Sequence, residues 1–362
     1  MKESYRIVIA GLRNAGKSTL ANILSGQEIS IVSPVPGTTT DAVTRRVELP
    51  GIGICTIVDT AGLDDEGPLG RQRVAASIRE IKSADALITV GPVPEEHSAL
   101  FSELAGKTIA LEGKDFDKDL IFKKIKAILD KKATRTILQG LLKAGDTVVL
   151  VCPQDSAAPE GRLILPQVMA IRDILDHDAT AVVLKPGQLN AYLASRPGPS
   201  LVVTDSQVFK EVAAVVPESI PLTSFSMLLA RSKGPFEAYV TGTKALDSLK
   251  DGDRILMLEA CAHHTTCEDI GRVKIPALVR RFSGKAVEFD FVGGTGEAPL
   301  PIGSYALVIQ CGGCVATSAQ LHARVAGALE AGVPICNYGM AIAYMTGIFN
   351  RVCPKEFLTK TF

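Results

Sequence analysis

The sequence predicts an α/β fold, because short apolar runs alternate with helix-like segments through most of its 362 residues. Three observations carry this prediction. The apolar run of residues 5–10 leads directly into a glycine-rich loop and a helix, the pattern restarts near Thr134, and it restarts again near Ser226. A chain of this length is expected to form two or three domains. We therefore expect domains at 1–132, 136–222 and 226–362, the second and third being smaller and built on parallel sheets.

Composition and charge narrow the class of protein. Hydrophobic residues make up 46% of the chain and charged residues 22%, as in an ordinary soluble globular protein. A net charge of zero does not favour nucleic acid or an anionic membrane as a partner. No apolar stretch has the length of a membrane span, and the first residues run into a strand rather than a signal peptide. We expect a cytoplasmic protein whose eight cysteines are free thiols or metal ligands.

The first strand is followed by the segment Gly11-Leu-Arg-Asn-Ala-Gly16-Lys17-Ser18 and a helix. This is the P-loop pattern G-x4-G-K-S between a strand and a helix, so the first domain is predicted to be a P-loop NTPase. Backbone N–H groups cradle the phosphates, Lys17 reaches the β- and γ-phosphates, and Ser18 binds Mg²⁺. The predicted nucleotide-binding residues are Gly11, Asn14, Ala15, Gly16, Lys17, Ser18, Thr19 and Asp59.

Two further segments extend this site. Residues 33–41 have the composition of a mobile loop that could bring a threonine to the metal, and residues 55–62 form a strand that ends in Asp59 and Gly62. The P-loop and these segments, in this order, resemble the TrmE–Era class of translation-factor-like GTPases. The resemblance implies that Thr39 binds Mg²⁺ with Ser18 and Asp59, and that Lys17, Thr39 and Gly62 act in GTP hydrolysis.

The nucleotide domain departs from complete G domains in two places. Leu63 stands where many small GTPases have a glutamine that orients water, whereas Asn14 occupies the position of an asparagine that holds K⁺ in the resembling class. The resemblance thus implies a slow GTPase that depends on Mg²⁺ and K⁺. The guanine-reading N-K-x-D motif is absent from residues 107–117. Either residues 107–117 contain a degraded base-reading strand, or the base-reading strand was lost and Leu111-Glu-Gly belongs to the last loop. Weaker guanine preference is expected in both cases.

The middle segment carries strands at residues 146–152, 180–184 and 200–204, with helix-like sequence between them. It contains no clustered acid or base residues, so we interpret it as a region of self-association that forms a homodimer. Cys152 at the end of its first strand is expected to be a core thiol.

The third segment holds a pair of cysteine motifs, each at the end of an apolar run. Cys261-Ala-His263 follows the first run, and Gln310-Cys311-Gly-Gly-Cys314 follows the second after 46 intervening residues. Strand ends of one sheet can lie side by side, so three thiolates and one imidazole could converge. Such ligands suit an iron–sulfur cluster or zinc. His264 and Cys267 compete with His263 for the fourth position, and the remaining cysteines are expected to be core thiols: Cys55, Cys336 and Cys353.

Together, the P-loop domain, the middle domain and the CxH…CxxC domain resemble the HydF family of [FeFe]-hydrogenase maturation GTPases over essentially the whole chain. Residues 158–167 and 337–343 are also similar to family segments. The resemblance implies a [4Fe–4S] cluster on Cys261, Cys311 and Cys314 with a labile fourth iron site, and a dimer through the middle domain. Gln310 replaces a histidine of the family pattern, so no ligand role is assigned to it.

The resemblance further implies a scaffold or carrier. Such proteins receive a diiron precursor from radical-SAM maturases and deliver it to apo [FeFe]-hydrogenase. The alternative is a zinc-stabilised dimeric interaction protein with a vestigial nucleotide domain, because zinc also accepts three cysteines and one histidine.

Overall fold

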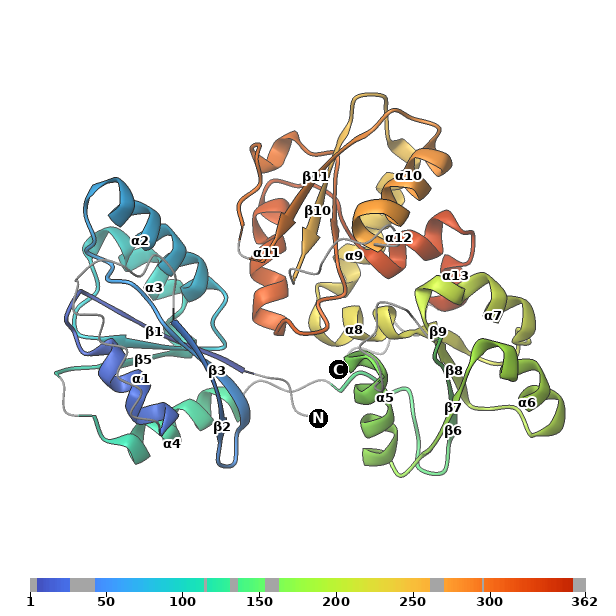
Figure 1. Ribbon diagram of the computed structural model, residues 1–362, viewed down its shortest axis with the longest axis horizontal. Helices are drawn as coiled ribbons and strands as arrows, with labels where there is room; N and C mark the ends of the chain where they lie inside the picture. Colours follow the sequence, from blue (N-terminus) through green and yellow to red (C-terminus); the bar gives the residue numbers. More distant parts are fainter. Residues whose placement is uncertain are drawn as a thin grey trace. The chain divides into compact units, whose positions relative to one another are not determined.

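Figure 1 shows the computed structural model of the chain. The structure describes residues 5–26, 43–113, 116–130, 136–153, 163–260, 270–294 and 296–353. Contacts between residues divide the chain into two compact units, Lys2–Thr134 and Arg135–Phe362. In these described ranges, no helix is both long enough and apolar enough to cross a membrane.

The first unit is built on a sheet with the strand order β2-β3-β1-β4-β5. The bounds of these strands are β1 Tyr5–Gly11, β2 Val43–Leu49, β3 Gly53–Asp59, β4 Ala86–Val90 and β5 Thr108–Leu111. All neighbouring strands run parallel except β2, which pairs antiparallel with β3. The predicted parallel α/β arrangement is confirmed here, and the antiparallel edge strand is an addition that the sequence analysis did not predict.

Helices cover both faces of this sheet (Figure 1). Their bounds are α1 Lys17–Ser25, α2 Gly67–Lys82, η1 Glu95–His97, α3 Ser98–Glu103, η2 Ala105–Lys107 and α4 Lys118–Asp130. Leu20 of α1 and Ile125 of α4 pack on one face, against β-strand residues such as Ile7. Ile81 of α2 and Phe101 of α3 pack on the other face. The last helix of the unit therefore shares its face with the first.

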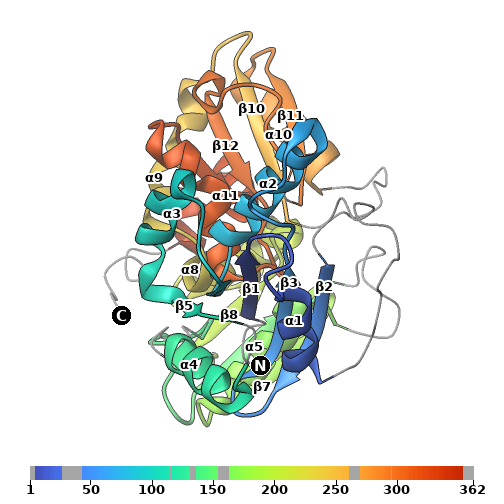
Figure 2. The ribbon, with the colours of Figure 1, turned by 90° about the vertical axis from the view of Figure 1, so that its left-hand side faces the viewer.

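The second unit contains two four-stranded sheets in which all strands run parallel. Their orders are β7-β6-β8-β9 and β11-β10-β12-β13. The strand bounds in the first are β6 Thr147–Val151, β7 Thr180–Leu184, β8 Leu201–Thr204 and β9 Leu222–Ser224. Those in the second are β10 Arg254–Glu259, β11 Glu288–Gly293, β12 Leu307–Gln310 and β13 Ile335–Asn337. Figure 2 shows β10, β11 and β12 side by side.

The helical segments of the second unit connect and cover these strands. With the first sheet come α5 Leu165–Asp176, η3 Pro186–Gln188, α6 Leu189–Ser195, η4 Ser206–Val208, α7 Phe209–Val215 and α8 Phe225–Lys233. Next come α9 Phe236–Thr243, η5 Lys244–Ser248, η6 Ile270–Lys274, α10 Ile275–Ser283 and η7 Ile302–Ser304. The chain continues with α11 Ser318–Glu330, α12 Tyr338–Met345 and α13 Phe349–Val352.

The two sheets of this unit repeat one topology in the same register. Val149 of β6 pairs with Val202 of β8, and Leu256 of β10 pairs with Val308 of β12, at corresponding places. The turn before each first strand is also repeated. Lys143 donates its N–H to the Asp146 carboxylate at 2.7 Å, and Lys250 donates its N–H to the Asp253 carboxylate at 2.8 Å. The unit therefore contains an internally repeated α/β motif.

The two halves exchange their last helices. α9 follows the first half in sequence yet packs on β13, and α13 follows the second half yet packs on β9. Thr223 of β9 donates its hydroxyl to Val352 O at 2.9 Å, and at the corresponding place Thr243 of α9 lies 3.0 Å from the sulfur of Cys336.

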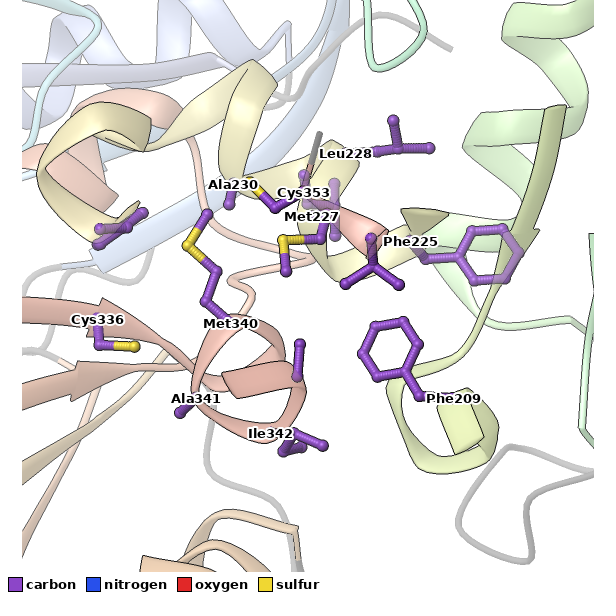
Figure 3. Packing of buried hydrophobic residues seen from close by; sticks show 14 of the residues in the cluster. Phe209, Phe225, Met227, Leu228, Ala230, Cys336, Met340, Ala341, Ile342 and Cys353 are labelled. Atoms are coloured by element: carbon purple, nitrogen blue, oxygen red, sulfur yellow. The ribbon is translucent and has the colours of Figure 1, made fainter. Parts of the chain in front are cut away.

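As a result, a single hydrophobic cluster runs through both halves. Figure 3 shows Phe209 and Phe225 of the first half in the same cluster as Met340 and Ile342 of the second. The predicted domain bounds stay a prediction. The hydrophobic core is continuous across residues 222–226, where the middle domain was expected to end and the third to begin.

Candidate functional site

The P-loop of the first unit leads from β1 into α1 as predicted. Asn14 has a left-handed backbone, with φ 57°, and Gly16 has φ 102° immediately before α1 begins at Lys17. Lys17 is buried, and its ammonium donates to Gly11 O at 3.2 Å and to Leu12 O at 2.7 Å. The loop thus curls around the lysine, with the backbone of α1 beginning beside it, as phosphate binding requires.

Ser18 and Asp59 lie together at the carboxyl end of the sheet. Ser18 Oγ donates to Asp59 Oδ2 at 2.6 Å. Asp59 Oδ1 is buried, and among the described residues it has no hydrogen-bond partner. Burial raises the pKa of Asp59, whereas Ser18, Lys17 and Arg45 oppose that shift. A buried carboxylate oxygen without a donor, next to a serine hydroxyl, fits a Mg²⁺ ligand pair.

The segment after Asp59 turns back onto the P-loop. Leu63 donates its N–H to Gly11 O at 3.2 Å, and Gly62 lies against the Arg13 side chain. Asp64 accepts the Arg13 N–H at 2.6 Å, and the Arg13 guanidinium lies 3.3 Å from Asp65. These two aspartates also act on Lys17: burial lowers its pKa, and the negative charges of Asp59, Asp64 and Asp65 oppose that shift.

Sequence reasoning did not predict this contact between Arg13 and the aspartates after Leu63. A basic residue inside the P-loop and an Asp-Asp pair after D-T-A-G are its only signals in the sequence. Thr39, the remaining predicted Mg²⁺ ligand, lies outside the described residues.

Cys311 and Cys314 follow β12 at the carboxyl edge of the second sheet. Both are free thiols that are partly exposed. Cys311 donates its N–H to Leu258 O of β10 at 2.9 Å, and its sulfur accepts the Ala260 N–H at 3.1 Å. Cys311 and Cys314 therefore lie where β10 and β12 end side by side, and this is where parallel sheets commonly bind ligands.

The loop between the two cysteines needs its second glycine. Gly313 has φ 58°, and a Cβ there would lie 2.4 Å from Leu321 of α11. Burial raises the pKa of Cys311, whereas the N–H groups of Ala260 and Gly313 and the charge of Arg324 oppose that shift. Two sulfurs on a tight loop, one already accepting backbone N–H groups, fit an iron–sulfur ligand pair.

The other two predicted ligands, Cys261 and His263, lie outside the described residues, as do the competitors His264 and Cys267. Among the residues that the structure describes, no group of three or more His, Cys, Asp or Glu side chains is arranged to hold a metal. The complete ligand set thus remains a prediction.

The environment of Gln310 differs from that of the predicted ligands Cys311 and Cys314. Its side chain is 1% exposed, accepts the Tyr239 hydroxyl and donates to Leu321 O at 3.3 Å. The amide therefore faces away from solvent, into the layer between β12 and its helices. The four cysteines that we expected to be core thiols are buried, as predicted: Cys55, Cys152, Cys336 and Cys353.

Comparison with known proteins agrees with this arrangement. The family model described as a 50S ribosome-binding GTPase matches residues 6–115. The Hydrogen maturase F dimerization domain matches residues 137–234, and the Hydrogen maturase F tetramerization domain matches residues 237–354. The chain is thus a P-loop GTPase domain followed by two parallel-sheet α/β domains. The family models that match these two domains are named for self-association. It belongs to the hydrogen maturase F family, which confirms the family resemblance seen in the sequence.

Individual relatives match the nucleotide domain alone. The tRNA modification GTPase MnmE of Methylobacterium sp. (strain 4-46) is 46% identical over 101 residues, which cover 27% of this chain and 23% of that protein. MnmE of Leptothrix cholodnii is 38% identical over 106 residues, which cover 28% of this chain and 22% of that protein. The chain thus spans less than a quarter of the length of these curated relatives. These relatives and the family model agree in assigning this domain to the P-loop GTPases.

A crystal structure of Era from Aquifex aeolicus bound to GDP.AlF4- was also found. It is 15% identical, with a TM-score of 0.25, and the match covers 81% of this chain and 94% of that chain.

Proposed function

We propose that the protein is a GTP-hydrolysing scaffold or carrier that binds a [4Fe–4S] cluster and assembles or delivers a diiron precursor to apo [FeFe]-hydrogenase. The observation that carries the proposal is the cysteine pair at the end of β12. Cys311 accepts the N–H of Ala260, and Ala260 directly precedes Cys261 in the sequence. Two ligand-bearing segments therefore begin within hydrogen-bonding distance of each other.

In the nucleotide domain, Lys17 would contact the β- and γ-phosphates, and Ser18, Asp59 and Thr39 would hold Mg²⁺. The unpartnered Asp59 Oδ1 supports the Mg²⁺ role, and the exposed left-handed Asn14 supports a K⁺ role. Leu63 is buried and apolar, so it cannot orient water. We therefore propose slow turnover that depends on Mg²⁺ and K⁺. Lys17→Ala should abolish nucleotide binding, whereas Lys124→Ala, which changes an exposed lysine of α4, should leave it unchanged.

The face that α4 covers bears on base recognition. Right-handed crossovers place α2 and α3, which connect strands toward the β5 edge, on one face of the sheet. A helix leading from β5 to a further strand beyond that edge would lie on the same face, yet α4 packs on the opposite face with α1. This supports the second sequence alternative, in which the base-reading strand was lost and Leu111-Glu-Gly belongs to the last loop. Guanine selectivity should then be weak in a competition titration against ATP.

In the cluster domain, Cys261, Cys311 and Cys314 would bind iron, and His263 would occupy the fourth position weakly. Thiolates bind iron strongly, whereas neutral imidazole is a weaker donor that protons can displace. A cluster held in this way would supply an exchangeable iron site for the incoming diiron unit. Partly exposed ligand thiols are stable in a reducing cytoplasm, which supports the expected location.

Partners follow from the family. We propose a homodimer through residues 136–222, radical-SAM maturases as donors and apo [FeFe]-hydrogenase as acceptor. Apolar side chains exposed on α5 and the edge strand β7 support the dimer: Val168 is 38% exposed, Leu175 58% and Val183 43%. The tetramerization model on residues 237–354 supports a further assembly that the sequence analysis left open.

Metal identity is the decisive test. Protein purified anaerobically should be brown, contain about four irons per chain and lose its visible absorption in Cys311→Ser and in Cys314→Ser. Cys55→Ala, which changes a buried cysteine of the nucleotide domain, is the matched control and should keep the iron. Colourless protein with one zinc per chain would instead support the zinc-stabilised interaction protein.

A further inference from the structure

Arg324 of α11 ties together the carboxyl ends of two strands. Its guanidinium donates to Glu259 O of β10 at 2.7 Å and to Val292 O of β11 at 3.0 Å. It also donates to Gly294 O, just after β11. A planar guanidinium with five donors can bind several carbonyl oxygens at once, and a lysine ammonium cannot reproduce this fork.

These contacts of Arg324 lie next to the cysteine pair. Glu259 is followed by Ala260, whose N–H reaches the Cys311 sulfur at 3.1 Å, and then by Cys261 in the sequence. On the other side, α11 is the helix that follows the Cys311–Cys314 loop. Arg324 therefore joins the segment that leads to the first predicted ligand to the helix that follows the last two.

The charge of Arg324 also acts on this site. Its guanidinium binds the carbonyl oxygen of Glu259, the residue before Ala260, and the Ala260 N–H reaches the Cys311 sulfur, so the positive charge lies close to the cysteine pair. The nearest acidic side chain on β10, Glu259, is bound by Arg272 at 2.7 Å. The carbonyl oxygen of Glu259 binds one arginine and its carboxylate binds another, so the two cations have separate roles.

We propose that Arg324 is a positioning residue of the cluster site, which holds the β10 end at the spacing that the ligands require and raises the reduction potential of the bound cluster. The inference rests on the proposed cluster function. The geometric role needs the forked guanidinium, because this one rigid group binds three carbonyl oxygens. The electrostatic role needs only the charge, because a nearby cation stabilises the more negative, reduced state of a cluster. The two roles can thus be separated by substitution.

Arg324→Gln removes both fork and charge, and Arg324→Lys keeps the charge without the fork. Arg280→Gln is the matched control, because Arg280 donates to Val287 O before β11 and stacks on Phe289, at the other end of the same sheet. Two quantities are measured on full-length protein. The first is Co²⁺ affinity of the anaerobic, metal-free form, from the thiolate-to-cobalt absorption. The second is the midpoint potential of the iron-loaded form, from an EPR-monitored titration.

Both Arg324 variants should bind Co²⁺ about tenfold more weakly than wild type, the size of effect expected when a partner of metal ligands is lost. The midpoint potential should fall in Arg324→Gln, by about 59 mV if the reduced state loses tenfold in relative stability. Arg324→Lys should stay near wild type in potential, and Arg280→Gln should match wild type in both measurements.

Wild-type affinity and potential in both Arg324 variants would overturn the inference while leaving the cluster function standing. If wild-type protein binds neither iron nor Co²⁺, the cluster function itself is wrong, and the inference falls with it. Arg324→Lys also guards against misfolding, since it preserves the charge and most of the side-chain volume. Circular dichroism compares the fold of each variant with that of the control.

Discussion

At the residue scale, the cysteines that the structure describes fall into two environments. Cys55, Cys152, Cys336 and Cys353 are buried, and burial raises the pKa of each thiol to about 12. Cys311 and Cys314 are partly exposed. Because the thiolate is the reactive form, the buried thiols are inert on two counts, being both protonated and shielded.

This difference predicts the pattern of alkylation. In reduced, metal-free native protein at mildly alkaline pH, iodoacetamide should label Cys314 readily and should leave the four buried cysteines unlabelled until the chain unfolds. Loading with iron should protect Cys311 and Cys314. Peptide mapping by mass spectrometry checks both statements. Labelling of a buried cysteine at the rate of Cys314 would contradict the packing described here.

The hydrogen bond between Tyr239 and Gln310 makes a second residue-scale prediction. Tyr239 is 2% exposed, and burial raises its pKa, so the hydroxyl stays a donor to Gln310 at neutral pH. Tyr239→Phe and Gln310→Met should each lower the free energy of unfolding by about 1–3 kcal/mol, because each leaves a buried polar group unpaired.

The double variant should lose less than the sum of the two single losses. Urea denaturation of all four proteins gives this coupling, and additivity within about 0.5 kcal/mol would remove the bond from the stability of the unit. Gln310→Ala should keep the cluster, because no ligand role is assigned to Gln310, but the burial of this side chain means that stability must be measured alongside iron content.

Local motifs explain which of these residues could be predicted. Lys17, Ser18 and Asp59 were predicted because the P-loop and D-T-A-G are short segments whose spacing fixes their chemistry. Arg324 and Tyr239 could not be predicted in this way. Each binds a partner that is distant from it in sequence, and these partners are a backbone carbonyl and a buried amide. Nothing in a single sequence marks which arginine binds a carbonyl oxygen.

At the element scale, most strands were predicted because fully buried parallel strands are written as apolar runs. β1 and β6 are examples, each buried along nearly its whole length. β2 was missed because its side chains alternate between exposed and half-buried, which produces no apolar run. The exchange of α9 and α13 was also missed, because periodicity shows that a helix has an apolar face without showing which sheet that face covers.

The exposed face of α5 supports a prediction about assembly. Val168 and Leu175 lie seven residues apart on one face, within the region matched by the dimerization model. Val168→Lys combined with Leu175→Lys should convert the dimer to a monomer, because an unpaired buried charge costs about 3 kcal/mol, or about a hundredfold in the dissociation constant.

Sedimentation equilibrium measures this change. Leu120→Lys on α4, where an exposed leucine lies in the nucleotide domain, is the control and should not alter the dimer. Point variants of the full chain are preferable to an isolated 136–222 fragment, because that fragment would cut β9 at its first residue and would lack α13, which packs on β9. An unchanged dimer in the double variant would place the interface on another face.

At the scale of the whole molecule, the second unit is a repeated motif whose halves meet at corresponding positions. Ser224 caps α8 by accepting the Met227 N–H, and Asn337 caps α12 by accepting the Gly339 N–H. Two residues beyond each cap, Ser226 and Gly339 occupy equivalent places and lie against each other. One half places a serine and the other a glycine at this contact, so the repeat is symmetric in backbone but not in side chain.

This contact yields the last prediction. A Cβ on Gly339 would lie 1.9 Å from Ser226 Oγ and 2.7 Å from Ser226 Cβ, so Gly339→Ala must push the two helices apart. We expect a loss of about 1–3 kcal/mol in the free energy of unfolding. Because one core runs through both halves, the whole unit should unfold in one transition at a lower denaturant concentration.

Ser226→Gly supplies the matched test. Alone it should cost a smaller amount, since Ser226 loses its hydrogen bonds to Ser206 at 2.8 Å and Ser224 at 3.0 Å. Combined with Gly339→Ala it vacates the space that the new methyl group needs, so the double variant should be more stable than Gly339→Ala. Hydrogen exchange of β6 and β10, followed through the denaturant transition, reports on each half separately. Loss of protection in β10 well before β6 would show that the halves unfold apart and that the repeat does not act as one body.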